Sequence, residues 1–278
     1  MEKYTIKKDS VQETLIIPLV GRKYAADKFP ELISDPTAAQ ILERIDYDFE
    51  SKTKTMESAM GTYGALEAAQ RAYDMEWEIK DYLKGHPCAA VVNMGCGLDN
   101  IFDRVDNGTC TCYNLDYDDV IAVRNEVIAP SEREKNIACD LNDTSWFDEI
   151  DDRDGVIFAA SGVFYYFTKA NAKKLFVKLA GRFPGGVLVF DACNKTGLKM
   201  MLSSWIRTAD IKDVGAYFDL SCPEKELAPW SGCFAKIETR SYMNGYRQLK
   251  NVRLLFKLLN WVADHIVKMN IVKITFAG

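Results

Sequence analysis

Short apolar runs alternate with helical patterns from about residue 85 to the end of the chain. Five of these runs have the length and composition of buried strands, and they are Ala89–Met94, Thr109–Asp116, Lys135–Asp140, Gly155–Ala160 and Gly186–Asp191. Between the last two, apolar residues from 172 to 183 recur at helical spacing, with Thr168 as a candidate N-cap and Pro184 as a stop. Strands that alternate with helices predict a parallel sheet with right-handed crossovers.

The C-terminal part keeps this rhythm with a different polarity. Phe234–Tyr242 and Ile271–Phe276 read as strands, and we expect them to form a hairpin-like pair at the sheet edge. The helix predicted between them carries an apolar stripe made of Val252, Leu255, Phe256, Leu259, Val262 and Ile266. Residues 194–232 contain proline, glycine and tryptophan without a regular period, so we predict an insertion there.

The first 84 residues follow a helical pattern. Apolar and aromatic residues spaced by threes, fours and sevens from Met56 to Trp77 predict one long amphipathic helix. Two shorter helical pieces before it are separated by Phe29-Pro30 and Asp35-Pro36. We therefore expect an N-terminal helical cap, residues 1–84, in front of a core that spans residues 85–278.

Composition excludes several classes of protein. The 278 residues are 48% hydrophobic and 27% charged, as in an ordinary globular protein, and the net charge is -5. A mildly acidic chain lacks the positive surface that nucleic acid or an anionic membrane requires. No segment approaches the roughly 20 apolar residues of a membrane helix. We expect neither nucleic acid nor membrane as a partner.

The eight cysteines contain no CxxC pair, and two histidines are too few for the usual zinc site. The cysteines fall in apolar, strand-like segments, which is typical of buried free thiols in a reducing cytoplasm. The sequence thus predicts a cytoplasmic protein without a metal.

The candidate chemistry begins where the first strand ends. Gly95-Cys-Gly97 allows a tight turn and a close approach of a ligand to the backbone. The third glycine of a dinucleotide fingerprint is replaced by Asn100, which removes the usual seat for a pyrophosphate. Asp116 ends the next strand, 21 positions after Gly95, where an acid accepts hydrogen bonds from both hydroxyls of a ribose.

A second acid ends the third strand. Asp140 is placed to accept from an adenine amino group, and the following backbone N–H, that of Leu141, is placed to meet a ring nitrogen. Three successive strand ends therefore point to an adenosine site without a pyrophosphate. S-adenosylmethionine is the commonest ligand of that description.

Several motifs resemble the leucine carboxyl methyltransferase family, and within it the tetracenomycin-type polyketide O-methyltransferases. They occupy residues 93–106, 113–116, 139–141, 162–168 and 182–191, and the resemblance covers roughly residues 15–195. It implies an α/β class I methyltransferase with a seven-stranded, doubly wound Rossmann-like sheet. It also implies S-adenosylmethionine as the methyl donor, bound at Gly95, Gly97, Asp116, Asp140 and Leu141.

The resemblance assigns two N-terminal residues and marks one departure. Arg71 matches an arginine that holds the donor's carboxylate, a task that suits a guanidinium fork. Lys23 matches a lysine near the methionine end of the donor. Ser161 stands where the family usually carries glutamate, so this position lacks the negative charge that would face a cationic sulfonium ligand.

No residue is identified as a general base, and the oligomeric state is not predicted. The candidates are His86, His265, Tyr165, Tyr166 and Asn194, and none has a sequence context that assigns it this role. Aromatic residues of the N-terminal cap and the insertion suit an apolar, ring-bearing small molecule: Tyr24, Phe29, Trp205, Tyr217 and Trp230.

Three functions therefore remain open. The first is an O-methyltransferase that acts on a hydroxyl or carboxylate of a small, polyketide-like metabolite. The second is a protein C-terminal carboxyl methyltransferase, and the third is a non-catalytic protein that binds S-adenosylmethionine.

Overall fold

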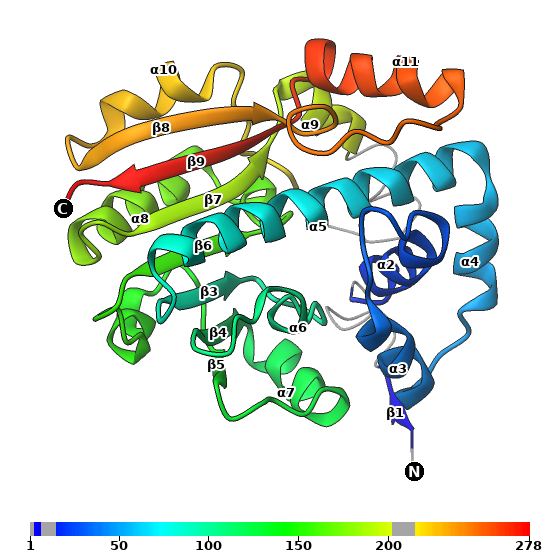
Figure 1. Ribbon diagram of the computed structural model, residues 1–278, viewed down its shortest axis with the longest axis horizontal. Helices are drawn as coiled ribbons and strands as arrows, with labels where there is room; N and C mark the ends of the chain where they lie inside the picture. Colours follow the sequence, from blue (N-terminus) through cyan, green and yellow to red (C-terminus); the bar gives the residue numbers. More distant parts are fainter. Residues whose placement is uncertain (1–2, 7–14, 202–214) are drawn as a thin grey trace.

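A seven-stranded sheet forms the centre of the computed structural model, which describes residues 3–6, 15–201 and 215–278 (Figure 1). Its strands, in spatial order, are β5 (Glu134–Ala138), β4 (Thr111–Asp116), β3 (Ala90–Met94), β6 (Val156–Ala160), β7 (Val187–Ala192), β9 (Asn270–Phe276) and β8 (Phe234–Ser241). The first five run parallel, and β9 pairs antiparallel with both β7 and β8. The predicted α/β fold with a seven-stranded doubly wound sheet is confirmed.

Both faces of the sheet are covered because the strand residues alternate between two apolar clusters. Ala90, Val92 and Met94 belong to one cluster, whereas Val91 and Ile157 belong to the other. The first cluster is closed by α8 (Lys169–Arg182) and the 3₁₀ turn η1 (Thr144–Glu149). The second is closed by α5 (Ala59–Gly85), α6 (Phe102–Val105) and α11 (Leu254–Val262). Burial on both faces explains why these strands read as continuous apolar runs.

The boundaries of α8 follow the sequence signals. The Thr168 hydroxyl accepts a hydrogen bond from the Asn171 backbone N–H at 3.1 Å, as an N-cap does. The helix ends at Arg182, two residues before Pro184. The predicted cap and stop are both confirmed.

The N-terminal helices gather beyond the carboxyl ends of the parallel strands (Figure 1). They are α2 (Ile16–Lys28), α3 (Pro36–Arg44) and α4 (Glu50–Glu57), followed by α5, and a small parallel pair joins β1 (Tyr4–Thr5) to β2 (Ile45–Asp46). Asp35 caps α3 by accepting from the Ala38 N–H at 2.9 Å, which explains the predicted break at this point. The small pair of strands carried no sequence signal that we recognised.

The long helix predicted from Met56 onward is two helices. The chain breaks at Ser58, whose extended ψ of 157° ends α4, and whose hydroxyl then accepts from the Gly61 N–H at 3.0 Å as the N-cap of α5. The apolar period continues through the break, so periodicity alone did not reveal it. The helix α5 ends at Gly85, next to the predicted boundary at residue 84, and it packs against β6 and β7 of the core. The division into a cap and a core stays a prediction.

The C-terminal helix departs from its predicted apolar stripe. Phe256 is 4% exposed, but Leu255 and Ile266 are 49% and 51% exposed. The helix α11 starts only at Leu254 and is followed by a π-helical turn, η5 (Ala263–Val267), which rotates the later residues away from the regular period. Leu258 and Trp261 are also exposed, so this helix presents an apolar outer face.

The predicted insertion contains several short elements. These are α9 (Lys195–Met201), α10 (Pro223–Leu227) and the 3₁₀ turn η4 (Ala228–Trp230). The rings of Phe218 and Trp230 pack against Phe176 of α8, so this part of the insertion completes the core. Trp205 lies outside the described residues. Within the described residues, no helix is long and apolar enough to cross a membrane.

The cysteines agree only partly with the prediction of buried thiols. All eight are free thiols, and Cys96, Cys110, Cys112 and Cys193 are buried. The others are more accessible: Cys139 is half-buried, and Cys88, Cys222 and Cys233 are exposed. The exposed ones lie in turns at the ends of strands and helices, where the apolar sequence context does not imply burial.

We predict that Asp74 makes stability fall as pH rises. This residue of α5 is 0% exposed, its Oδ1 accepts from Gln70 at 2.8 Å, its Oδ2 has no hydrogen-bond partner, and burial raises its pKa to about 9. The unfolded carboxyl loses its proton near pH 3.9, so between that pH and about 9 stability decreases by up to about 1.4 kcal/mol per pH unit.

Asp74→Asn removes this titration and keeps an acceptor for Gln70. Thermal unfolding from pH 5 to pH 8 should show the variant gaining stability over the wild type as pH increases. Two curves that stay parallel across this range would show that Asp74 is already ionised in the folded protein.

Candidate functional site

The loop after β3 is shaped by two glycines in left-handed conformations. Gly95 and Gly97 have φ of 64° and 49°, which residues with side chains rarely adopt. A Cβ atom at Gly95 would also lie 2.6 Å from Val163 Cγ2, in the loop after β6. Glycine at this position thus lets the loops after β3 and β6 approach each other, and it leaves a stretch of backbone without side chains.

Asp116, at the end of β4, holds this loop with both carboxylate oxygens. Its Oδ2 accepts from the Gly97 N–H and its Oδ1 from the Tyr117 N–H, each at 2.8 Å. Partial burial raises the pKa of Asp116, and these two N–H groups counteract the increase. Each carboxylate oxygen accepts one of these bonds and retains capacity for a second, which is what a pair of ribose hydroxyls needs.

Asp140 lies beside Asp116 because the ends of β4 and β5 are tied together. The Cys139 N–H donates to the Asp116 main-chain oxygen at 2.8 Å. Asp140 is exposed and orders its own turn by accepting from the Asn142 N–H at 2.9 Å, while Leu141 is buried. A cavity of about 710 Å³ opens here, lined by Tyr117, Asp118, Asp119, Ala138, Cys139, Asp140, Asp143 and Ser145.

Arg71 of α5 reaches the ends of β6 and β7. Its Nη1 donates to Asp191 Oδ2 at 3.2 Å, and Asp191 Oδ1 accepts from the Gly162 N–H at 2.6 Å. Gly162 has a φ of 74°, and a Cβ there would lie 2.9 Å from Arg71 Nη1. The guanidinium side chain remains 29% exposed, so part of its donor set faces outward next to Ser161.

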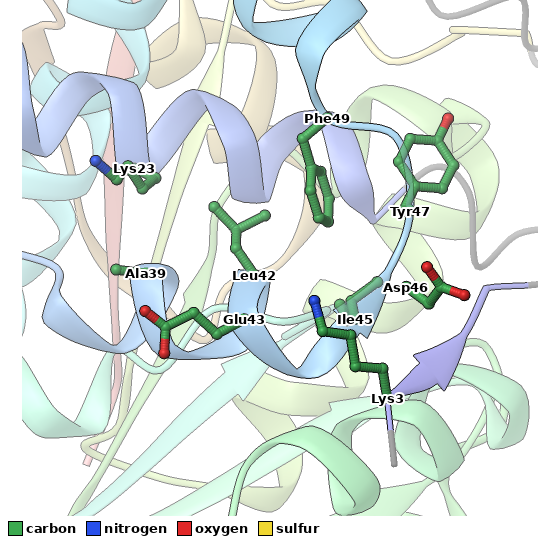
Figure 2. Close-up of a pocket in the computed structure, with 9 residues that line it drawn as sticks. All are labelled: Lys3, Lys23, Ala39, Leu42, Glu43, Ile45, Asp46, Tyr47 and Phe49. Atoms are coloured by element: carbon green, nitrogen blue, oxygen red, sulfur yellow. The ribbon is translucent and has the colours of Figure 1, made fainter. Parts of the chain in front are cut away.

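The structure does not bring Lys23 together with the strand ends. Figure 2 shows Lys23 of α2 at a pocket of about 380 Å³, whose other lining residues come from the N-terminal 49 residues. Lys23 also forms an ion pair with Asp27 on its own helix. The neighbouring Arg22 contacts the glycine loop instead, with Nη2 donating to the Leu98 main-chain oxygen at 2.7 Å and Nε pairing with Asp35 at 2.8 Å.

A buried arginine that the sequence analysis missed fixes the rest of the loop. Arg124 of α7 (Asp118–Val127) is 1% exposed. Its Nη1 donates to the main-chain oxygens of Gly97 at 3.2 Å and Asp99 at 2.7 Å, and its Nη2 donates to Asn100 Oδ1 at 3.1 Å. A charged residue on a helix usually faces solvent, so this role of Arg124 is not apparent from its sequence context.

The same arginine connects the loop to a row of amides inside the sheet. Arg124 Nε donates to Asn136 Oδ1 at 3.2 Å. Asn114 donates to Asn136 at 3.1 Å, and Asn93 donates to Asn114 at 3.2 Å, across the paired positions of β3, β4 and β5. Three asparagines on neighbouring strands therefore set the position of the guanidinium.

No general base emerges from the histidines. His86 precedes β3, at the opposite end from the glycine loop, and stacks on Tyr82. His265 is exposed and stacks on Trp261. In the described parts of the chain, no group of three or more histidine, cysteine or acidic side chains is arranged to hold a metal ion.

The residues present fit an adenosine ligand with an amino-acid tail. The glycine loop offers bare backbone, Asp116 offers a carboxylate with spare acceptor capacity, and the cavity beside Asp140 extends past the end of β5. At the other side of the loop, Arg71 offers a partly exposed guanidinium.

Comparisons with known proteins agree with this geometry. The chain is 29% identical over 190 residues, 68% of its own length and 68% of the relative's, to "Tetracenomycin polyketide synthesis O-methyltransferase TcmP" of Streptomyces glaucescens. It is 22% identical over 280 residues to "S-adenosyl-L-methionine-dependent methyltransferase dpfgK" of Gibberella zeae, covering 95% of this chain and 93% of the relative.

Solved structures share the fold. A protein from Thermobifida fusca superposes with a TM-score of 0.58 at 12% identity, over 87% of this chain and 93% of that one. The plantazolicin methyltransferase BamL, solved with SAH, has a TM-score of 0.54 at 11% identity, over 97% and 100%. Residues 16–180 match the family described as Leucine carboxyl methyltransferase, more than half of the chain. The chain therefore belongs to the leucine carboxyl methyltransferase family and is an S-adenosylmethionine-dependent methyltransferase.

Proposed function

We propose that this enzyme methylates a hydroxyl or carboxylate oxygen of a small, polyketide-like metabolite in the cytoplasm. The observation that carries the proposal is the 29% identity to TcmP, which spans the glycine loop and both acidic strand ends. The net charge of -5 favours a small acceptor over a polyanionic one.

We further propose a division of the donor site into two ends. Gly95 and Gly97 line the middle of the donor, Asp116 accepts from its ribose hydroxyls, and Asp140 with the Leu141 N–H faces its adenine. The hydrogen bonds that fix Asp116 and the cavity beside Asp140 support this division.

At the second end, Arg71 binds the donor's carboxylate. Its partly exposed guanidinium and its position at the ends of β6 and β7 support this assignment. Ser161 and Lys23 stay predictions: Ser161 lies next to the Arg71 contact, whereas Lys23 faces a different pocket.

Positioning dominates the chemistry that such a site performs. S-adenosylmethionine supplies a methyl group on a positively charged sulfur, which is a good leaving group. The protein's own task is to hold donor and acceptor in line and to exclude water, an effect worth about 7–11 kcal/mol in well-oriented reactions. An acceptor oxygen bonds to the methyl carbon as the carbon–sulfur bond breaks, and a hydroxyl acceptor also loses its proton.

A protein C-terminal carboxyl group is the second candidate acceptor. The description of the matching family, which names leucine carboxyl methylation, favours it. A carboxylate arrives ionised and needs no base, which agrees with the lack of an identified base in the described residues. The two candidates differ in the size and chemistry of the acceptor, so they are separable by turnover.

We predict that Asp116→Ala weakens binding of S-adenosylhomocysteine by about 10- to 100-fold, since hydrogen bonds to a charged acceptor contribute about 1.5–3 kcal/mol each. Isothermal titration calorimetry measures the affinity, for which we expect a wild-type Kd near 1 μM, about -8 kcal/mol. Asp154→Ala, which removes an exposed carboxylate at the other end of β6, is the control and should bind normally. Equal affinities for wild type and Asp116→Ala would contradict the ribose assignment.

We predict turnover with small ring-bearing acceptors and none with a peptide. Labelled S-adenosylmethionine is incubated with a panel of phenols, small carboxylic acids and a peptide with a C-terminal leucine. For a phenol, the rate should increase from pH 6 to pH 8 as the hydroxyl ionises, while a carboxylic acid should give a flat profile. Methylation of the peptide alone would favour the second candidate.

A further inference from the structure

Three polar side chains follow one another on the face of α5 that leads to the strand ends. Tyr63, Glu67 and Arg71 are four residues apart, so they lie one above the other on the same side of the helix. Arg71 contacts Asp191 at the end of β7. Each earlier residue lies about 6 Å further along the helix axis, which places Glu67 one turn beyond the guanidinium.

Among the described residues, the polar groups of two of these three side chains have no hydrogen-bond partner. Tyr63 is 6% exposed, yet its hydroxyl makes no hydrogen bond. Glu67 is half-buried, and its carboxylate has no hydrogen bond or ion pair among the residues that the structure describes, Arg71 included. A buried polar group without a partner is costly, and it is retained at sites where a ligand contacts it.

The main chain at Glu67 is held by a residue that follows β8. The Tyr242 hydroxyl, just after β8, donates to the Glu67 main-chain oxygen at 2.9 Å. The charged and titratable groups around the Glu67 carboxyl are Tyr63 and Arg71 on α5 and Tyr242 from the β8 end. Asp264 of η5 faces Tyr63, and Asp191 pairs with Arg71.

In these surroundings, the protonation state of Glu67 depends on whether a cation lies beside it. Burial raises the pKa of Glu67 to about 7, although Arg71 counteracts the increase. Near neutral pH, a large share of the molecules therefore carry a protonated Glu67. An ammonium group placed beside it would favour the ionised form and release that proton.

We propose that Glu67 binds the α-ammonium group of the donor's methionine moiety, next to the α-carboxylate held by Arg71. This inference rests on the proposed donor site. An α-amino acid carries its two charges on groups attached to one carbon, and α5 presents a guanidinium and a free carboxylate one turn apart. Ser161, at the end of β6, is uncharged, so Glu67 supplies the negative charge at this end of the site.

The alternative role for Glu67 is that of a base for the methyl acceptor. The acceptor oxygen must lie at the methyl carbon, in line with the carbon–sulfur bond, and the sulfur is three bonds further along the methionine chain than the α-carbon whose carboxylate Arg71 holds. The ammonium is attached to that α-carbon itself. The one-turn spacing between Glu67 and Arg71 therefore favours the ammonium.

Calorimetry with two ligands tests the proposal. S-adenosylhomocysteine carries the amino acid, whereas 5′-methylthioadenosine has the same nucleoside and thioether without it. Glu67→Gln should weaken binding of S-adenosylhomocysteine about 10-fold or more and leave that of 5′-methylthioadenosine unchanged. The matched control is Asp81→Asn, which removes one charge near the other end of α5 and should alter neither affinity.

Proton release provides a second readout that needs no variant. At pH 7, titrations in buffers of different ionisation enthalpy should show the wild type releasing part of a proton as S-adenosylhomocysteine binds, and none with 5′-methylthioadenosine. Because binding requires the ionised form, affinity for S-adenosylhomocysteine should decrease as pH falls from 8 to 6. Glu67→Gln should show neither effect.

Unchanged binding of S-adenosylhomocysteine by Glu67→Gln, without proton release in the wild type, would overturn the proposal. A variant that keeps its affinity but loses turnover would also overturn it, and would assign Glu67 to the acceptor instead. Failure of the underlying donor site is distinguishable, because the wild type would then bind neither ligand.

Discussion

The glycine loop after β3 depends on one buried guanidinium. Arg124 donates to two main-chain oxygens of the loop and to the Asn100 side chain, and it is itself held by Asn136 of β5. A buried charge is tolerated only where hydrogen bonds satisfy it, so the loop and the arginine stabilise each other. Two contacts hold the loop that contains the left-handed residues Gly95 and Gly97. Arg124 donates to the Gly97 main-chain oxygen, and Asp116 accepts from the Gly97 N–H.

This constraint agrees with the two chemically different ends of the proposed donor site. At one end, β4 and β5 stop beside each other and present acids to an open cavity. At the other end, the buried Asp191 accepts from the Gly162 N–H and from Arg71, and so holds the Arg71 guanidinium at the ends of β6 and β7. The glycine loop lies between them, and the proposed donor would cross it at Gly95 and Gly97, which carry no side chains.

Much of the sheet could be predicted from the sequence, because its strands are buried on both faces and bounded by glycines and acids. The ends of β3, β4 and β5 were located to within two residues, and Asp116 and Asp140 lie side by side as expected. Side-chain contacts between distant segments could not be predicted in this way. Arg124 and Glu67 read as ordinary charged positions on helices, and only the packing of α7 and α5 shows otherwise.

Periodicity failed where local hydrogen bonding changed the helix. Ser58 starts a new helix within a continuous apolar pattern, and the π-helical turn after α11 moves Ile266 to the surface. Lys23 and Arg22 show a related limit. These adjacent residues of α2 differ in their contacts, because Arg22 donates to the glycine loop whereas Lys23 lines a pocket among the N-terminal residues. A motif match does not determine which of them reaches the loop.

We infer that the Arg124 guanidinium preorganises the glycine loop of the proposed donor site. The most direct measurement is the affinity of Arg124→Met for S-adenosylhomocysteine, made on protein that retains its circular dichroism spectrum. Methionine fills similar space but cannot donate to the Gly97 and Asp99 oxygens, so we expect an affinity at least about 10-fold below that of the wild type. A folded Arg124→Met protein with wild-type affinity would contradict the account.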